Sequence, residues 1–137
     1  MLNEIIVDVF AGGGGASSGI LVRLCSNLIG GYIMNLEGKI VFISGAITGI
    51  DGYRKIFAAA ERWLLEQDCT VLNPAVLPPT GMTWDAYLRI TKAMLREADV
   101  VYVLQNWEHS RGVKEELDLA ARLGKEIIYE PREAVIV

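Results

Sequence analysis

Lys39-Ile-Val-Phe-Ile-Ser-Gly-Ala-Ile-Thr-Gly-Ile-Asp-Gly52 is the stretch of sequence from which the fold can be worked out. It begins with a continuous apolar run of strand length, residues 39–44, and continues in a loop punctuated by glycines. From here to residue 130 the pattern alternates regularly between strand and helix. The stretch therefore predicts the first strand of an α/β domain.

Three helices and three further strands follow this first strand. Helical spacing of apolar residues predicts helices at 53–67 and 83–98 and a third between the loop 105–112 and Gly124. Short apolar runs predict strands at 69–73, 100–104 and 126–130. Asp51 is the expected cap of the first helix, and the proline-rich segment 74–81 is an expected loop. Strands separated by single helices pair in parallel, so we expect a three-layer, flavodoxin-like or Rossmann-like sheet of four to five strands with flanking helices.

Composition and charge exclude several classes of protein. The 137 residues are 52% hydrophobic and 22% charged, which is typical of one globular domain. The net charge of −4 argues against binding to duplex nucleic acid, although a small nucleotide needs only a few donors. No apolar run reaches membrane-spanning length and no signal peptide is evident, so we expect a cytoplasmic protein.

Metal and disulfide sites are not expected either. Cys25 and Cys69 lack the spacing of metal ligands and do not make a disulfide framework. A single histidine excludes a histidine-rich site. We therefore expect neither a metal nor a cofactor.

Residues 1–33 differ from the rest of the chain. Residues 5–10 predict a buried strand, and the run Ala11-Gly-Gly-Gly-Gly15 after it is of the kind that cradles a phosphate or cofactor. Residues 5–20 resemble the first S-adenosylmethionine motif of cytosine-5 DNA methyltransferases, but the ribose-binding acid and the Pro-Cys loop of those enzymes are absent. The alternative is a strand and a linker without a ligand.

The sequence from Met34 onward looks like the start of an ordinary domain. We therefore expect residues 1–33 to be an atypical extension, either a methyltransferase-like fragment or the product of a start codon chosen too early. Residues 34–137 are expected to form the main domain. The apolar tail 134–137 is expected to pair with a sheet, because a bare apolar strand would be prone to aggregate.

Glu116 is a carboxylate at the edge of an apolar helical stripe. A carboxylate turned toward the sheet is costly unless it is paired, solvated in a cleft or used. The simplest alternative is that Glu116 extends to solvent or pairs with a neighbouring Lys or Arg. The loops 44–52 and 105–112 both lie at the carboxyl edge of the sheet, where ligands bind. The stripe itself consists of Val113, Leu117, Ala120 and Ala121.

Residues 39–130, about two-thirds of the chain, resemble the nucleoside 2-deoxyribosyltransferase superfamily. Within it they are most similar to a branch of small, mostly phage and bacterial domains of unknown function, DUF4406. The motifs are more specific for the fold than for an activity. The matching residues are Ile43-Ser-Gly-Ala-Ile-Thr-Gly49, Leu72-Asn-Pro74, Ala98-Asp99, Trp107-x-x-Ser110-x-Gly112, Glu116 and Leu123-Gly-Lys125.

The resemblance implies a mechanism. Glu116 would attack the anomeric carbon of a 2-deoxynucleoside, and a second base or water would resolve the glycosyl-enzyme, as in a retaining glycosidase. Ser110 would contact the sugar or its phosphate, or is simply the N-cap of its helix. Backbone N–H groups of the loop after the first strand would line the sugar or phosphate pocket. The substrate-binding residues implied are Ser44, Gly45, Ala46, Ile47, Thr48, Gly49, Trp107 and Gly112.

Simpler roles remain open for three of these residues. Gly45 and Gly49 are turn glycines in the alternative interpretation. Trp107 would then only cover the edge of the sheet.

One position departs from the active relatives. They carry an aspartate where this chain has Thr91, which donates a hydrogen bond but is no general acid near neutral pH. Asp85 lies on roughly the opposite face of the same helix. Base departure would be unassisted or helped by another group such as Tyr87 or Glu115.

Three functions follow as hypotheses. The first is an N-glycosidic bond enzyme acting on a (deoxy)nucleoside or nucleoside 5′-monophosphate, by transfer or hydrolysis. The second is a catalytically weak nucleotide-binding domain, which Thr91 favours, and a remote third is a methyltransferase fragment. The resemblance also implies a homodimer or higher oligomer. The base, the need for a 5′-phosphate and the acceptor stay open.

Overall fold

The computed structural model describes residues 28–29, 32–33 and 35–131. The chain divides into two compact units, of which the larger is Leu36–Glu130. In the smaller unit the described strands β1 (Leu28–Ile29) and β2 (Tyr32–Ile33) pair antiparallel. The strand and glycine-rich segment expected before residue 28, Cys25 and the tail 134–137 all lie outside the described residues. The boundary expected at residue 34 stays a prediction.

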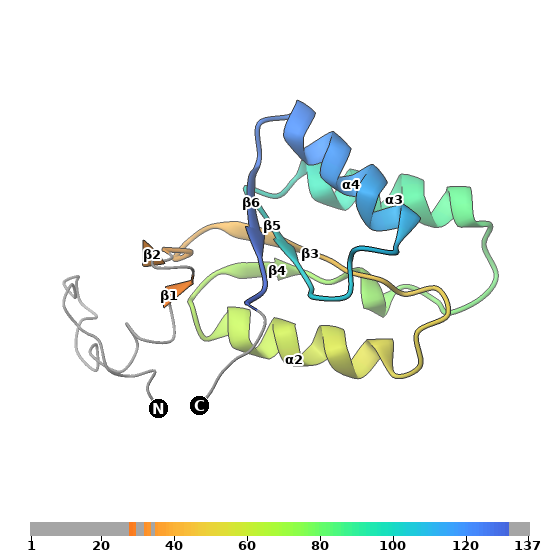
Figure 1. Ribbon diagram of the computed structural model, residues 1–137, viewed down its shortest axis with the longest axis horizontal. Helices are drawn as coiled ribbons and strands as arrows, with labels where there is room; N and C mark the ends of the chain where they lie inside the picture. Colours follow the sequence, from red (N-terminus) through yellow and green to blue (C-terminus); the bar gives the residue numbers. More distant parts are fainter. Residues whose placement is uncertain (1–27, 30–31, 34, 132–137) are drawn as a thin grey trace. The chain divides into compact units, whose positions relative to one another are not determined.

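The larger unit is built on a parallel sheet of four strands in the order β4-β3-β5-β6. The chain passes from β3 to β4 at one edge and then returns to the other side of β3 to form β5 (Figure 1). The order of strands therefore reverses between β3 and β5, where Val41 pairs with Val100 and Ser44 with Val103. The strands are β3 (Ile40–Ser44), β4 (Thr70–Leu72), β5 (Val100–Val103) and β6 (Glu126–Tyr129).

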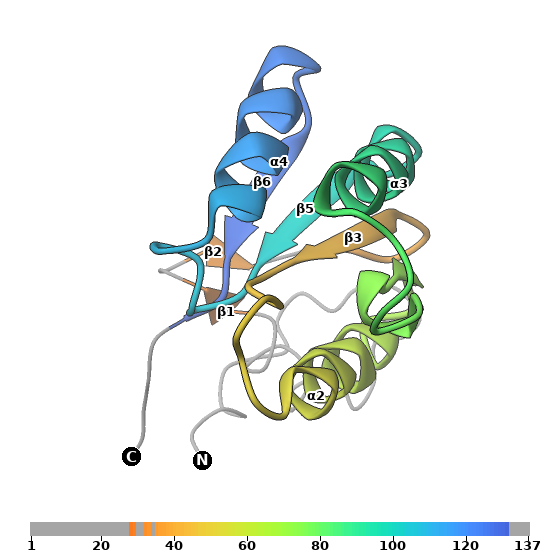
Figure 2. The same ribbon diagram turned by 90° about the vertical axis from the view of Figure 1, so that its right-hand side faces the viewer.

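Helices cover both faces of the sheet, so the expected three-layer fold is confirmed. The helix α2 (Tyr53–Leu65) lies on one face, and α3 (Trp84–Arg96) and α4 (Arg111–Arg122) lie together on the other (Figure 2). The α3 helix begins at the N-cap Thr83, whose hydroxyl accepts a hydrogen bond from the Ala86 N–H. In the described part of the chain, no helix combines the length and apolarity needed to cross a membrane.

The core has one layer on each side of the sheet. On the α2 side, Trp63 stacks on Tyr102 with ring centres 5.7 Å apart. On the other side, Phe42 is fully buried among residues of β5, α3 and α4, and because strand side chains alternate, Ser44 points to the same side as Phe42. That layer consists of Phe42, Leu95, Ala98, Val101, Val103, Val113, Leu119 and Ala120.

Two local expectations are wrong. Asp51 does not cap α2, because the N-cap is Gly52 in the left-handed conformation (φ 72°) and no side chain caps this helix end. The segment 74–81 is not loop throughout, because residues Pro74–Val76 form the 3-10 helix η3. Asn73 caps this turn, accepting a hydrogen bond from the Ala75 N–H at 2.8 Å. Proline at the first position of a helical turn is favourable, which is the signal that the loop interpretation overlooked.

Candidate active site

The site lies at the carboxyl ends of β3 and β5, where the order of strands reverses. In open α/β sheets this is the place where a crevice forms and ligands bind. Ser44 is the last residue of β3 and is fully buried on the side that faces α4. On this side of the sheet β3 carries the apolar ring of Phe42 and then, at its end, the hydroxyl of Ser44. That hydroxyl is a polar group available to a side chain of α4.

Glu116 is that partner. The Ser44 hydroxyl donates a hydrogen bond of 2.6 Å to the Oε1 atom of Glu116, whose residue is only 7% exposed. The alternative in which Glu116 extends to solvent or pairs with a Lys or Arg is therefore wrong. Lys92 on α3 instead pairs with Glu115, the residue before Glu116, at 2.9 Å.

The buried stripe of α4 differs from the expected one by a small rotation. Glu116 lies within the stripe and not at its edge, and Ala121 is exposed. The helix begins at Ser110, whose hydroxyl accepts a hydrogen bond from the Val113 N–H at 3.2 Å, so its expected alternative role as an N-cap is confirmed. This cap fixes the helix so that the carboxylate meets the end of β3. The buried residues of α4 are Val113, Glu116, Leu119 and Ala120.

Burial raises the pKa of Glu116 above its usual value, because the charged form loses water. Hydrogen bonds from Ser44 and Thr91 and the charge of Lys92 oppose this rise. The hydroxyl of Thr91 donates to the Leu88 carbonyl at 3.2 Å and has a single proton to give. Because the Thr91 proton is engaged by the Leu88 carbonyl, Ser44 is the side chain that donates a hydrogen bond to the Glu116 carboxylate.

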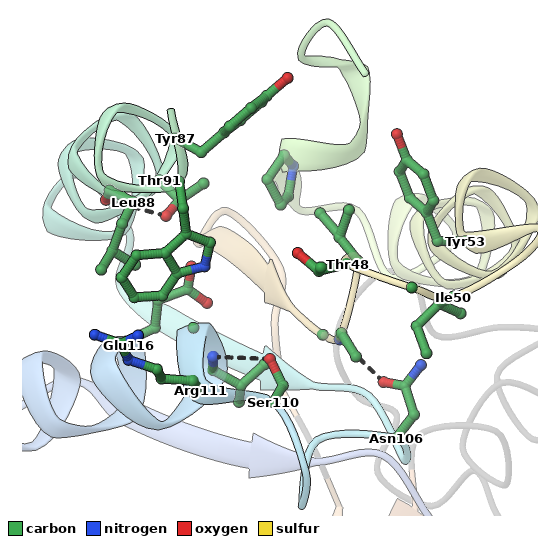
Figure 3. A pocket seen from close by; sticks show the side chains of 18 of the residues that line it. Thr48, Ile50, Tyr53, Tyr87, Leu88, Thr91, Asn106, Ser110, Arg111 and Glu116 are labelled. Carbon is green, nitrogen blue, oxygen red and sulfur yellow. Dashed lines mark hydrogen bonds between the residues drawn. The ribbon is translucent and has the colours of Figure 1, made fainter. Parts of the chain in front are cut away.

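A cavity of about 990 Å³ opens beside Glu116. Figure 3 shows Thr48, on the loop after β3, across the same space from Glu116 on α4 and from Ser110 at the start of that helix. One part of the wall is apolar and aromatic, with Tyr53, Trp84, Tyr87, Leu88, Leu77, Pro78 and Pro79. The other part carries most of the polar groups, with Thr48, Asp51, Asn106, Glu108, His109, Ser110 and Arg111.

The proline-rich part of the wall is fixed from both sides. The Tyr87 hydroxyl donates a hydrogen bond to the Pro78 carbonyl. The guanidinium of Arg54 on α2 donates to the Leu77 carbonyl at 2.9 Å. These two contacts attach the segment that follows η3 to helices on opposite faces of the sheet.

The structure brings most of the expected site residues together. Ser44 reaches the site through its hydrogen bond to Glu116 and does not itself line the cavity. Trp107 is not brought to the cavity, because its ring packs on Tyr129 of the edge strand β6 with centres 5.5 Å apart, as expected of a residue that covers the sheet edge. The expected residues that line the cavity are Gly45, Ala46, Ile47, Thr48, Gly49, Thr91, Ser110, Gly112 and Glu116.

The loop after β3 offers fewer free donors than expected. The Ala46 N–H donates to the Oδ1 atom of Asn106 at 3.1 Å, and the Ile50 N–H donates to the Ile47 carbonyl at 3.1 Å. Gly49 adopts a positive φ of 77° and is a turn residue, whereas Gly45 allows close approach, since an added Cβ would meet the Leu104 side chain at 2.5 Å. The expected backbone cradle is therefore partly occupied by the protein itself.

Of the two groups considered as substitutes for the acid missing at Thr91, only one lines the cavity. Tyr87 does so, with its hydroxyl engaged by Pro78. Glu115 does not, and its ion pair with Lys92 lowers its pKa, which makes it a poorer proton donor. Asp85 is exposed in the first turn of α3 and does not line the cavity.

Many residues of the wall were not predicted as site residues, among them Tyr53, Trp84, Asn106 and Arg111. Asn106 lies just beyond the end of β5, at the same edge as Ser44, and this position is a signal that the sequence contained. Arg111 is the first residue of α4, and its guanidinium carbon lies 4.3 Å from the centre of the Trp84 ring. The contact joins α3 and α4 in space, so periodicity along one helix could not reveal it.

Comparison with protein families gives a match over residues 39–129 to DUF4406, a domain of unknown function. The chain belongs to the DUF4406 family. The match covers the α/β unit that carries Glu116 and its cavity. A comparison with curated protein sequences gives no match.

Among solved structures, the DUF4406 domain is similar to a 2-desoxiribosyltransferase from Leishmania mexicana, with a TM-score of 0.55 and 19% sequence identity. The match covers 69% of this chain and 65% of that protein. At this identity the likeness is one of fold, and it agrees with the expected deoxyribosyltransferase-like architecture.

The methyltransferase resemblance of residues 5–20 has no support. The family match begins at residue 39, after these residues have ended. Among the residues that the structure describes, no cluster of three His, Cys, Asp or Glu side chains could hold a metal ion.

Proposed function

We propose that this DUF4406 domain acts on the N-glycosidic bond of a (deoxy)nucleoside or nucleoside 5′-monophosphate, by glycosyl transfer or hydrolysis, with Glu116 as the nucleophile. The observation that carries the proposal is the buried carboxylate of Glu116 at the wall of the cavity, held by Ser44 at 2.6 Å. A nucleophile of this kind must be ionised yet poorly solvated, and burial supplies the second condition.

The reaction proceeds in two steps. A carboxylate oxygen of Glu116 forms a bond to the anomeric carbon while the bond from that carbon to the base nitrogen breaks, and the bonding pair leaves with the base. A water molecule or a second base then attacks the anomeric carbon and releases the carboxylate, as in a retaining glycosidase. The Ser44 hydrogen bond fixes one oxygen of Glu116, which leaves the other to attack.

The polarity of the wall supports a nucleoside as the substrate. A flat heteroaromatic base fits the part of the cavity formed by Tyr53 and Tyr87, since aromatic faces stack favourably. A sugar, with its hydroxyl groups, fits the polar part that includes Thr48, Asn106 and Ser110. Glu116 lies on the same cavity wall, where it can reach the bond that joins the two.

A second candidate function is nucleotide binding without efficient turnover. Thr91 favours it, because the residues of α3 that line the cavity include no carboxylic acid to protonate a departing base. The two functions share the cavity and differ in whether bound nucleoside loses its base.

Base release tests the proposal directly. The purified protein is incubated with deoxynucleosides, ribonucleosides and their 5′-monophosphates, with and without a second free base, and free base and exchanged nucleoside are measured by chromatography. Release from at least one substrate is the expected result, and dependence on the second base separates transfer from hydrolysis. Tight binding of a nucleotide without any release would instead establish the binding function.

Ser44→Ala is expected to move the acidic limb of the pH–rate profile to higher pH. The Ser44 hydroxyl donates to the charged form of Glu116 and so lowers its pKa, against the rise caused by burial. Without this donor the carboxylate is ionised only at higher pH, and activity is lost earlier as the pH falls. The measurement is kcat/KM from about pH 4.5 to 9 for the variant and the original protein.

Asp118→Asn is the control for this profile. Asp118 is exposed on α4 and pairs with Arg122 at 3.2 Å, away from the cavity. Its substitution should leave the acidic limb of the pH–rate profile at the same pH as in the original protein. An unchanged limb in Ser44→Ala would show that the hydrogen bond does not set the ionisation of the nucleophile.

A further inference from the structure

Arg111 is the one Lys or Arg among the described residues that line the cavity. It is the first residue of α4, and its exposed side chain reaches across to α3, where the guanidinium lies over the face of Trp84. Figure 3 shows Arg111 beside Ser110 on the same wall as Glu116. The cation is therefore part of the site and not of the outer surface of the helix.

No carboxylate among the described residues forms an ion pair with Arg111. Two other cations of α3 and α4 are paired, since Lys92 pairs with Glu115 and Arg122 pairs with Asp118. Lys92, and not Arg111, is the cation whose charge acts on the pKa of Glu116. The charge of Arg111 is thus not used to balance the nucleophile.

The contact with Trp84 positions Arg111 without consuming its hydrogen bonds. A guanidinium that lies over an aromatic ring keeps the N–H donors along its edge, and those donors match a phosphate or carboxylate in geometry. Arg111 precedes Glu116 by five residues, about 7.5 Å along the axis of α4. A pentose with a charged substituent can span a separation of this order.

One backbone donor in the cavity is already engaged, since the Ala46 N–H donates to the Oδ1 atom of Asn106. The Ser110 hydroxyl accepts a hydrogen bond from the Val113 N–H as the cap of α4 and keeps its own proton to donate. Three carboxyl groups line the same cavity, those of Asp51, Glu108 and Glu116. Arg111 is the one Lys or Arg of the described lining that could offset the negative charge of these groups toward an anionic ligand.

We infer that Arg111, held over Trp84, is the residue that selects a nucleoside 5′-monophosphate over the neutral nucleoside. The inference rests on the proposed function, because it names the substrate class of the same site. The edge of the guanidinium donates charge-assisted hydrogen bonds to the phosphate while Glu116 faces the anomeric carbon.

The test compares a deoxynucleoside with its 5′-monophosphate as substrates. The original protein is expected to have the higher kcat/KM with the monophosphate, and Arg111→Gln to lower the monophosphate-to-nucleoside ratio of kcat/KM by about 10- to 100-fold, as for one lost charged partner. The loss should appear mainly in KM, since the contact is made equally in the ground state and the transition state. Trp84→Leu should lower the ratio by a smaller factor, because the cation stays but is less well positioned.

Arg122→Gln is the matched control, because it removes the same charge from the far end of α4, outside the cavity. It should leave the ratio as it is in the original protein. A ratio in Arg111→Gln that equals that of the control would overturn the inference while leaving the glycosidic function intact.

Binding measured by calorimetry separates this inference from the proposed function. If no substrate releases its base, the glycosidic proposal fails, and the dissociation constants of the same nucleoside and monophosphate then judge Arg111. A preference for the monophosphate that falls at least tenfold in Arg111→Gln supports the inference. Equal affinity for the two ligands, or no detectable affinity for either, overturns it.

Discussion

Glu116→Gln is expected to lower base release by a factor on the order of 10³ or more, because the nucleophile is lost. Gln keeps the shape of the side chain and an oxygen that accepts the Ser44 hydrogen bond, so the fold around β3 and α4 is preserved. The variant therefore isolates the charge of the carboxylate. Initial rates of base release on the best substrate of the panel measure the effect.

The same variant is expected to be more stable than the original protein at neutral pH. Burial raises the pKa of Glu116 above its usual value, so the folded state binds its proton more tightly than the unfolded state does. The resulting stability is fully present below about pH 4.5 and is lost as the pH rises through the pKa of the folded protein. Gln carries no charge and does not undergo this loss.

Thermal unfolding of both proteins from pH 4 to 8 checks whether Glu116→Gln is the more stable of the two at neutral pH. The melting temperatures of the two proteins should converge in acid and separate by a few degrees at neutral pH, where about 1 kcal/mol corresponds to roughly 4–8 °C for a domain of this size. Asp118→Asn, which removes an exposed carboxylate from α4, should show no such pH-dependent gain. Retained base release in Glu116→Gln would exclude Glu116 as the nucleophile whatever its effect on stability.

A gain in stability on removal of the Glu116 carboxylate has a physical meaning. A buried carboxylate without a cationic partner is costly, and the fold keeps Glu116 in place through the cap at Ser110 and the hydrogen bond from Ser44. Groups that destabilise a fold are characteristic of functional sites. An increase in Tm with a loss of activity would therefore be independent support for a functional role.

The strands and helices of the larger unit could be predicted because their signals are local. The apolar run at β3 and the helical spacing in α3 and α4 depend on neighbours in the sequence, and the single-helix connections imply a parallel sheet. The capping of α2 could not be predicted in this way. Asp51 is a residue type that favours caps, but the turn places Gly52 at the helix end with a positive φ.

The site was predictable only in part. Glu116 could be singled out because a carboxylate beside an apolar helical stripe is costly to bury, and the family resemblance implies that it is a nucleophile. Its partner Ser44 lies 72 residues away in the sequence, and the hydrogen bond depends on the packing of α4 over β3. The contact of Arg111 with Trp84 is likewise set by the packing of α4 against α3, which no local pattern records.

Phe42→Ala is expected to destabilise the protein by about 3–5 kcal/mol, the range for removal of a buried aromatic ring. Phe42 is fully buried where β3 meets α3 and α4, two residues before Ser44 on the same side of the sheet. The remaining stability would be small, since domains of this kind unfold with about 5–15 kcal/mol in total. Denaturant unfolding followed by circular dichroism gives the change in free energy.

Phe42→Leu is the matched variant, because it keeps an apolar side chain of intermediate size and should cost less than Phe42→Ala. Val76→Ala is the surface control, since Val76 is 70% exposed and its truncation should stay within about 0.5 kcal/mol. The ring of Phe42 packs against both helices that carry the site, so a protein that still folds as Phe42→Ala should also hold Thr91 and Glu116 less firmly. A loss below about 1 kcal/mol would mean that the layer under α3 and α4 is not packed as described.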